Sequence, residues 1–328
     1  MDTALEEKLY VLDGRTRKLL QESAPLMAKW SRTECKAKPA GGMEEWAKEH
    51  AEPHTHLVGC CDWYHGAWQY LRLLNMVAVP SWYEFYHRAL SAALRRRPHA
   101  NVLISACADY AMLATLHDAI EATGADPQIT ICDICATPLL ACEWYAARHE
   151  LSIDCVRDNI ITSSLMPPRA YDLILTDEFL TVLKAEYKPQ LVARWAQLLK
   201  PGGTVIATAM IGGPTTAPLR EGYALRASRL FERERATFRD VDGGAGDILD
   251  CTARFAACHT RHMVAHEGEI RALFCGYDLA FSRTITPGEC VNPTSSFQIV
   301  ATLRPRAASG ERRRTSSGLE PKEDRQAS

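Results

Sequence analysis

Polar side chains stand at the ends of several predicted strands of this chain. Asp133 directly follows the apolar run of residues 129–132, and Asp158 comes just after a further strand. Thr176 and Asp177 end the next one. Because ligands of open α/β sheets bind outside the carboxyl ends of the strands, these side chains are expected to share one site. Asp133 is placed to accept hydrogen bonds from both hydroxyls of a ribose, and Asp158 from an adenine amino group.

The loop after the first predicted strand limits which ligand this site can take. Strand 101–105 runs directly into residues 106–110, Ala-Cys-Ala-Asp-Tyr, where a dinucleotide-binding protein carries the phosphate-binding pattern G-x-G-x-x-G. A pyrophosphate needs backbone with no side chain in its way, and alanine and cysteine side chains line this turn. The sequence therefore favours a ligand that has a ribose and an adenine but no phosphates, of which S-adenosylmethionine (SAM) is the obvious candidate.

A dense group of aromatic residues precedes this strand. If residues 64–77 form a helix, one of its faces carries His65, either Trp68 or Gln69, and Arg72. Such a face predicts a lid over the SAM site, in which Arg72 binds a carboxylate and the aromatic rings attract a sulfonium through cation–π interactions. The alternative is that these rings are helix–helix core. The predicted substrate-binding residues are Trp68, Arg72, Tyr83 and Tyr86.

The predicted secondary structure that positions these residues changes at residue 101. Residues 1–98 are expected to be mainly helical, with a second helix next to the lid at 82–97, capped by Ser81. Strands and helices then alternate, which is typical of βαβ units and a parallel sheet. The expected strands are 101–105, 128–132, 152–156, 171–176 and 203–209. The expected helices between them are 109–121, 137–149 and 186–199.

The alternation ends in a charged helical stretch, which predicts an insertion over residues 216–262. A helix at 267–275 and strands at 278–285 and 296–303 are expected to close the fold. Residues 306–328 have no periodicity and predict a disordered tail. The predicted domains are an N-terminal helical cap (1–98), a SAM-binding α/β domain (99–305) and this tail.

Over residues 100–303 the chain resembles the class I SAM-dependent methyltransferases. The resemblance rests on an ordered set of segments: an acid after the second strand, Asp-Asn after the third, YDLILTDEFL, LKPGGTVIAT, and finally EGEIRALFCGYDL with SFQIVATLR. It implies a doubly wound, seven-stranded, mainly parallel sheet of the Rossmann-like methyltransferase type under an N-terminal helical cap. The implied SAM-binding residues are Ser105, Ala106, Cys107, Asp133, Ile134, Thr137, Asp158, Asn159 and Thr176.

The first loop departs from the family pattern. The family carries an acid near the end of the first strand and glycines after it. This chain has Ile104 in the place of the acid, and Ala106, Ala108 and Tyr110 in the glycine places. One interpretation is that SAM binding has been lost and the chain is a scaffold. The other is a divergent subfamily in which Ser105 and backbone carbonyls hold the methionine ammonium, and the retained acids favour it.

The resemblance and the strand-end residues predict an enzyme that transfers a methyl group from SAM to a small molecule, in specialised metabolism. Asp177 is predicted to be the base or orienting group, with Tyr64 and His65 next. One alternative is attack at the aminocarboxypropyl carbon of SAM with release of methylthioadenosine, as in azetidine-2-carboxylate synthases, which resemble methyltransferases. Another is a non-catalytic partner protein with the SAM-binding fold.

Composition argues against several other classes of protein. Lysine and arginine total 38 against 40 acidic residues, a net charge of −2, so neither a nucleic acid nor a membrane is expected as a partner. No apolar run approaches the roughly 20 residues of a membrane span, and the acidic N-terminus is unlike a secretory signal. A cytoplasmic location is therefore expected. The sequence leaves the oligomeric state open, a homodimer included.

The 12 cysteines are expected to be reduced and mostly buried. One group has the chemistry of metal ligands: His54, His56, Cys60, Cys61 and His65. Its spacing fits no common zinc pattern, because adjacent cysteines rarely both reach one tetrahedral ion. Residues 132–135 form a CxxC pattern that straddles a strand exit without a helix-capped redox context. The sequence therefore predicts no metal.

Overall fold

The structure is a computed structural model, and it describes residues 13–33, 61–74, 76–77, 83–238, 244–258, 260–285 and 295–305. Three sequence predictions lie outside these residues: the cap at Ser81, the group that includes His54, His56 and Cys60, and the tail 306–328.

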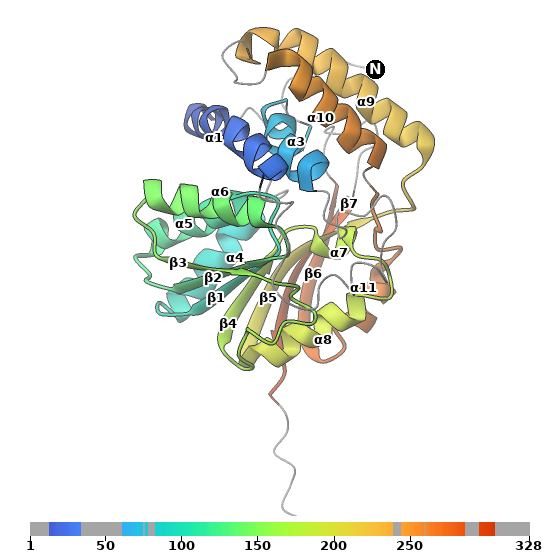
Figure 1. The fold of residues 1–328 in the computed structure, drawn as a ribbon. Helices are drawn as coiled ribbons and strands as arrows, with labels where there is room; N and C mark the ends of the chain where they lie inside the picture. Colours follow the sequence, from blue (N-terminus) through green and yellow to red (C-terminus); the bar gives the residue numbers. More distant parts are fainter. Residues whose placement is uncertain are drawn as a thin grey trace, which may run out of the picture.

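A seven-stranded sheet organises the molecule, in the order β3-β2-β1-β4-β5-β7-β6 (Figure 1). Neighbouring strands from β3 to β5 are parallel, and β7 runs antiparallel to both β5 and β6. The strand order reverses between β1 and β4, where such sheets bind their ligands. The predicted sheet is confirmed. The strands are β1 Asn101–Ser105, β2 Gln128–Asp133, β3 Ile153–Arg157, β4 Tyr171–Thr176, β5 Leu199–Ile211, β6 Tyr277–Ile285 and β7 Ser295–Leu303.

Helices cover both faces of the sheet because each central strand is apolar on both sides. In β1, Val102 and Ile104 pack into the core that contains α4 and α5, whereas Leu103 packs into the core that contains α8 and α11. Successive strand residues point to opposite faces, so one short strand supplies both cores. The covering helices are α4 Tyr83–Arg96, α5 Ala111–Thr123, α6 Ala136–Arg148, α7 Phe179–Val182, α8 Lys188–Leu198 and α11 Glu267–Leu273.

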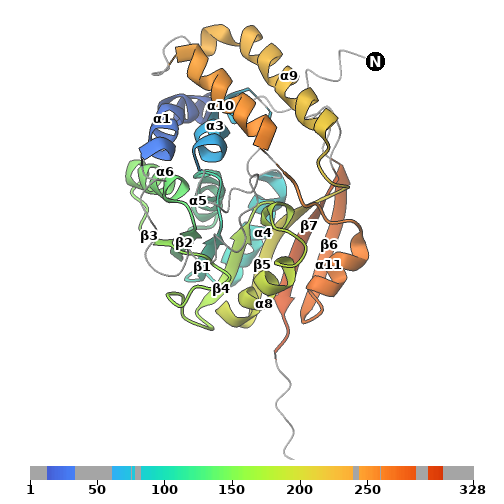
Figure 2. The same cartoon turned by 45° about the vertical axis from the view of Figure 1, so that its right-hand side comes forward.

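Four helices from two distant parts of the sequence form a further layer, here called the cap (Figures 1 and 2). They are α1 Gly14–Thr33, α3 Cys61–Leu73, α9 Ala217–Arg233 and α10 Gly244–Cys258; a short 3-10 helix, Arg235–Phe238, joins the last two. In the cap α3 packs on α1 and α10, and α10 packs on α9. The predicted insertion therefore completes the layer that α1 and α3 begin.

Helix α4 lies outside the cap, unlike in the predicted domain division. The sequence analysis assigned residues 1–98 to the cap, but α4 packs against α5 and β5. Its apolar face carries Phe85, Leu90 and Leu94, all buried, onto the α/β layer. Within the described residues before β1, only α1 and α3 belong to the cap.

Candidate functional site

The turn after β1 keeps a tight backbone without glycine. Ala106 has a φ of 64°, in the left-handed region that glycine adopts at little cost and alanine rarely adopts. Its N–H donates to the carbonyl of Cys132 at 2.9 Å. The next N–H, of Cys107, donates to Asp133 Oδ2 at 2.9 Å. Hydrogen bonds to β2 and to the acid that ends it therefore hold this conformation.

Asp133 connects the turn after β1 to the turn after β2 at the carboxyl edge of the sheet. Its side chain is buried, and Oδ1 accepts the N–H of Cys135 at 2.7 Å while Oδ2 accepts that of Cys107. An ionised carboxylate oxygen can accept more than one hydrogen bond. Asp133 thus fixes the two turns, and its contact with a ribose stays a prediction.

The predicted adenine side of the site lies after β3. The N–H of Asp158 donates to the carbonyl of Asp133 at 3.0 Å, which ties the third turn to the second. Asn159 is buried, and its Nδ2 has no hydrogen-bond partner among the described residues. Arg157 at the end of β3 donates to the carbonyl of Ile134 at 3.5 Å, and Thr137 is buried in the first turn of α6. A buried amide without a partner indicates a place for a ligand or a water.

The surroundings of Ser105 differ from those expected for a residue that binds the methionine ammonium. Its hydroxyl is buried and accepts the indole N–H of Trp195 at 3.0 Å. Trp195 lies on α8, on the opposite face of the sheet from α5. The structure therefore gives Ser105 a contact that fixes α8 at the end of β1, and its contact with a methionine ammonium stays a prediction.

The polar face of α3 lies against the turn after β1. His65 Nδ1 is 2.9 Å from the carbonyl of Ala108, and Arg72 Nη1 is 2.6 Å from Asp109 Oδ2. Gln69 Nε2 donates to the same carboxylate at 3.2 Å. Arg72 and Asp109 are both buried, so the guanidinium already has a carboxylate within the protein. The prediction that Arg72 binds a substrate carboxylate needs this correction.

The aromatic rings of α3 pack against the insertion, which agrees with the alternative that they are helix–helix core. Tyr64 stacks on Trp68 with ring centroids 5.1 Å apart, and Phe255 of α10 lies 5.5 Å from Tyr64. Burial raises the pKa of Tyr64, and the negative charges of Asp133 and Asp177 raise it further. The hydroxyl of Tyr64 is therefore protonated at neutral pH.

Asp177 is held from two directions at the end of β4. Its Oδ1 accepts the hydroxyl of Thr208 at 2.7 Å, and Tyr86 Oη lies 3.1 Å away. Tyr86 is fully buried and also donates to the carbonyl of Thr176 at 2.6 Å. The prediction that Tyr86 contacts substrate therefore needs correction, because its hydroxyl positions the end of β4. Thr176 Oγ1 is buried without a hydrogen-bond partner among the described residues.

Tyr83 does not lie with the other predicted site residues. It is 38% exposed, donates to Asp118 at 2.9 Å on α5 and stacks on His87. The sequence analysis grouped it with the substrate-binding residues because aromatic residues are dense in this stretch. Its position at the surface of the helix layer does not support that grouping.

Glu178 is a site residue that the sequence analysis missed. Its φ is 55°, and its carboxylate accepts hydrogen bonds from Thr181 Oγ1 at 2.6 Å, the N–H of Met210 at 2.7 Å and Ser296 Oγ at 3.0 Å. Burial raises the pKa of Glu178 to about 7, and the neighbouring charge of Asp177 contributes. The adjacent acids at the end of a strand were the signal that pointed to it.

The strand order and the final antiparallel strand define a class I SAM-dependent methyltransferase-like fold. Solved structures to which the chain is similar include a SAM-dependent methyltransferase from Methanosarcina mazei, at 15% identity over 64% of this chain and 94% of that one, with a TM-score of 0.43. Another is the N-methyltransferase NodS from Bradyrhizobium japonicum, at 15% identity over 66% of this chain and 94% of that one, with a TM-score of 0.39. A third is magnesium protoporphyrin IX methyltransferase from Synechocystis, with bound SAH. It has 10% identity over 85% of this chain and 99% of that one, and a TM-score of 0.41.

No family model and no curated protein sequence matches the chain. Among the residues that the structure describes, no helix combines the length and apolar character needed to cross a membrane.

Proposed function

We propose that this protein is a SAM-dependent methyltransferase that acts on a small molecule. The observation that carries the proposal is the set of groups at the carboxyl edge. Asp133 ends β2, Asp177 follows β4, and His65 of cap helix α3 has a ring nitrogen within 4.8 Å of a carboxylate oxygen of Asp133. This edge, at the switch between β1 and β4, is where the fold binds ligands.

The residues present fit SAM. Asp133 supplies a carboxylate for the ribose hydroxyls, and the turn at Ala106 is as tight as a glycine turn. Three buried polar atoms have no hydrogen-bond partner among the described residues at this edge and on α3: Asn159 Nδ2, Thr176 Oγ1 and Trp68 Nε1. Buried polar groups in native proteins are normally satisfied, so these atoms support a polar ligand there.

When bound, SAM would supply an electrophilic methyl group carried on a sulfonium, with S-adenosylhomocysteine as the leaving group. The chain's own residues must orient the attacking nucleophile, exclude water and accept its proton where it has one. Asp177 is the proposed acceptor, held in place by Thr208 and Tyr86. Tyr64 and Trp68 of α3, with Phe255 behind them, cover this edge and exclude water from it.

The test is to incubate the purified full-length protein with SAM, with and without candidate acceptors, and to identify the nucleoside product by mass spectrometry. S-adenosylhomocysteine that forms only when an acceptor is added supports the proposal. Methylthioadenosine formed from SAM alone contradicts it and favours attack at the aminocarboxypropyl carbon. Absence of SAM binding in calorimetry contradicts both and favours a scaffold.

Asp177→Asn tests the proposed proton acceptor. An amide oxygen still accepts from Thr208 but takes up no proton, so we expect turnover to fall by about 10²-fold while SAM affinity is unchanged, for an acceptor that must lose a proton. Asp154→Asn, at an exposed position of β3, is the matched control and should keep wild-type turnover.

A further inference from the structure

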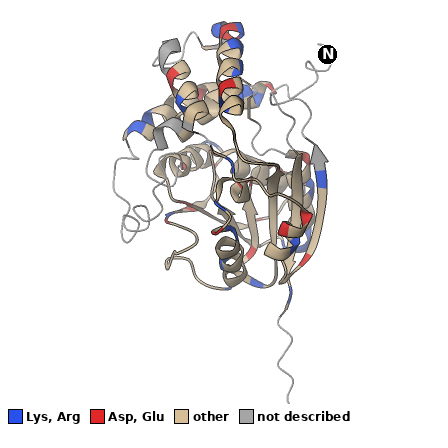
Figure 3. Ribbon diagram, turned by 90° about the vertical axis from the view of Figure 1, so that its right-hand side faces the viewer, with Lys and Arg blue, Asp and Glu red and all other residues tan. Residues whose placement is uncertain are grey.

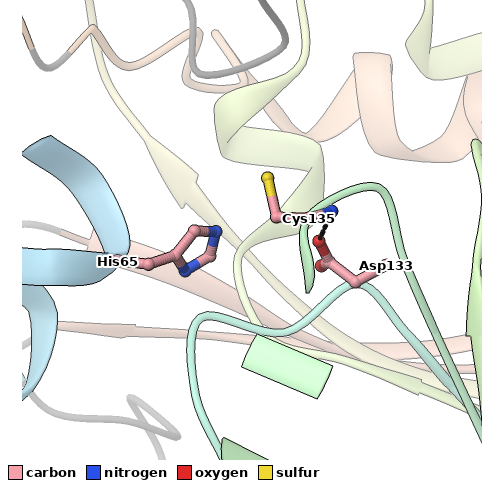
Figure 4. A group of neighbouring side chains, drawn as sticks. All are labelled: His65, Asp133 and Cys135. Carbon is pink, nitrogen blue, oxygen red and sulfur yellow. Dashed lines mark hydrogen bonds between the residues drawn. The ribbon is translucent and has the colours of Figure 1, made fainter. Parts of the chain in front are cut away.

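Three buried side chains with metal-binding atoms converge where α3 meets the turn between β2 and α6. They are His65, Asp133 and Cys135, and their ligand atoms all lie within 4.8 Å of one another. Figure 4 shows the imidazole of His65 pointing from α3 toward the other two, which come from the turn after β2. The three residues are separated in sequence, and only the packing of α3 on this turn brings them together.

The hydrogen bonds of His65 leave one ring nitrogen suited to a metal. Its Nδ1 lies 2.9 Å from the carbonyl of Ala108, and a carbonyl can only accept, so Nδ1 must carry the proton. In the neutral ring Nε2 is then the nitrogen with a lone pair. Metal-binding histidines usually donate their other N–H to a carbonyl or a carboxylate, which fixes the tautomer and the ring orientation.

The other two groups are held in a similar way. The carboxylate of Asp133 accepts the N–H groups of Cys107 and Cys135, which fixes its orientation. Cys135 is the N-cap residue of α6, and its side chain makes no cap hydrogen bond. Cys135 is buried, and its Sγ lies within 4.8 Å of the ligand atoms of His65 and Asp133.

We propose that His65, Asp133 and Cys135 bind one divalent cation of the zinc type. One imidazole, one carboxylate and one thiolate form a mixed set that suits Zn²⁺ better than Mg²⁺ or Ca²⁺, which prefer oxygen ligands alone. Bond lengths of about 2.0–2.3 Å place tetrahedral ligand atoms roughly 3.3–3.8 Å apart, so binding requires side-chain shifts of about 1 Å. The fourth position is left for a water or a substrate atom.

This site goes beyond the proposed methyl transfer and does not depend on it. The cation would tie α3 of the cap to the turn after β2 through residues of both. It would also share Asp133 with the ribose of SAM, so we expect bound cation and SAM to weaken each other's binding.

The experiment uses full-length protein freed of metal with a chelator and titrated with Co²⁺, a coloured probe for zinc sites. We expect one equivalent to bind with a thiolate-to-cobalt charge-transfer band, and Zn²⁺ to displace it. Cys135→Ser should abolish the band. His65→Gln should weaken Co²⁺ binding by at least roughly 10-fold, while its amide can still donate to the carbonyl of Ala108.

Cys275→Ser removes an exposed free cysteine and is the matched control, expected to keep the band and the stoichiometry. Circular dichroism of each variant shows whether it is folded, and one folded variant of the two is enough to test the site. Absence of a charge-transfer band in the wild type, or a band unchanged in Cys135→Ser, would overturn the proposal. SAM binding is measured separately by calorimetry on metal-free protein, so a failure of the metal site and a failure of the proposed function are distinguishable.

Discussion

At the scale of single residues, two neighbouring acids after β4 have different surroundings. Asp177 interacts with the hydroxyls of Thr208 and Tyr86, whereas Glu178 accepts three hydrogen bonds that link β4 to β5, β7 and α7. At Glu178 the loss of solvation outweighs these hydrogen bonds, so the pKa of its carboxyl is raised to about 7. One acid can therefore hold a proton near neutral pH beside the acid proposed to accept one.

The pKa of Glu178 predicts how stability depends on pH. The carboxyl titrates at about 7 in the folded protein and near its ordinary value of 4.5 when unfolded. Between these values the folded state binds more protons, so this group's contribution to the free energy of unfolding falls as pH rises from about 4.5 to about 7. Glu178→Gln does not titrate, and we expect a flatter dependence of the melting temperature on pH.

The comparison variant is Glu186→Gln, which removes a carboxyl at an exposed position and should keep the wild-type slope. Thermal unfolding followed by circular dichroism across pH 4–8 measures the melting temperature of the wild type and of both variants. Parallel curves for the wild type and Glu178→Gln would contradict the assignment of the raised pKa to Glu178.

At the scale of elements, α3 is fixed to the first turn by polar contacts along one face. Arg72 and Gln69 both reach Asp109, and Asp109 Oδ1 also accepts the N–H of Ala111 at the start of α5. Ser23 of α1 donates to Gln69 Oε1 at 2.6 Å, which extends the network to a second cap helix. These contacts attach the cap to the loop that departs most from the family pattern.

Arg72→Met should destabilise the protein because it leaves Asp109 buried without its cation. Removing one partner of a buried ion pair typically costs about 3–5 kcal/mol. We expect a loss of that order in urea unfolding, and partial recovery in Arg72→Met/Asp109→Asn, which removes the uncompensated charge. Arg148→Met disrupts an exposed pair with Glu22 and should cost under about 1 kcal/mol. Equal losses for Arg72→Met and Arg148→Met would argue against this network.

At the scale of the whole molecule, the cap is assembled from segments on either side of the α/β domain. The ring of Phe255 on α10 packs against Tyr64 and Trp68 of α3 and against Tyr223 of α9. Figure 3 shows basic and acidic residues interspersed along the upper helices. Charged residues of this stretch, such as Arg229 and Glu232, are exposed. The insertion thus has an apolar side on α3 and a charged side in water.

Phe255→Ala tests whether the insertion supports the cap. The side chain is only 1% exposed, so its loss should leave a cavity and cost about 3–5 kcal/mol. Limited proteolysis should then cut α9 and α10 faster than the α/β domain. Leu225→Ala, at a residue of α9 that is 53% exposed, should change stability by less than about 0.5 kcal/mol. Unchanged proteolysis of Phe255→Ala would show that α10 does not depend on this contact.

The amino-acid sequence alone was enough to predict the sheet and the edge at which the site is proposed. Local periodicity marks the strands, and the order of strands and helices places Asp133 and Asp177 at one edge. The structure confirms the five predicted parallel strands and the closing hairpin to within a few residues at each end.

The partner of each buried polar group, in contrast, follows from the tertiary structure. Arg72 meets Asp109, Ser105 meets Trp195, and His65 meets Cys135 through the packing of helices far apart in sequence. The tertiary structure also distinguishes aromatic residues that were grouped together from the sequence, because Tyr64 is buried against Trp68 and Phe255 while Tyr83 lies at the surface. Periodicity reports which face of an element is apolar, but not which element covers that face, and the chemistry of a buried polar group depends on that neighbour.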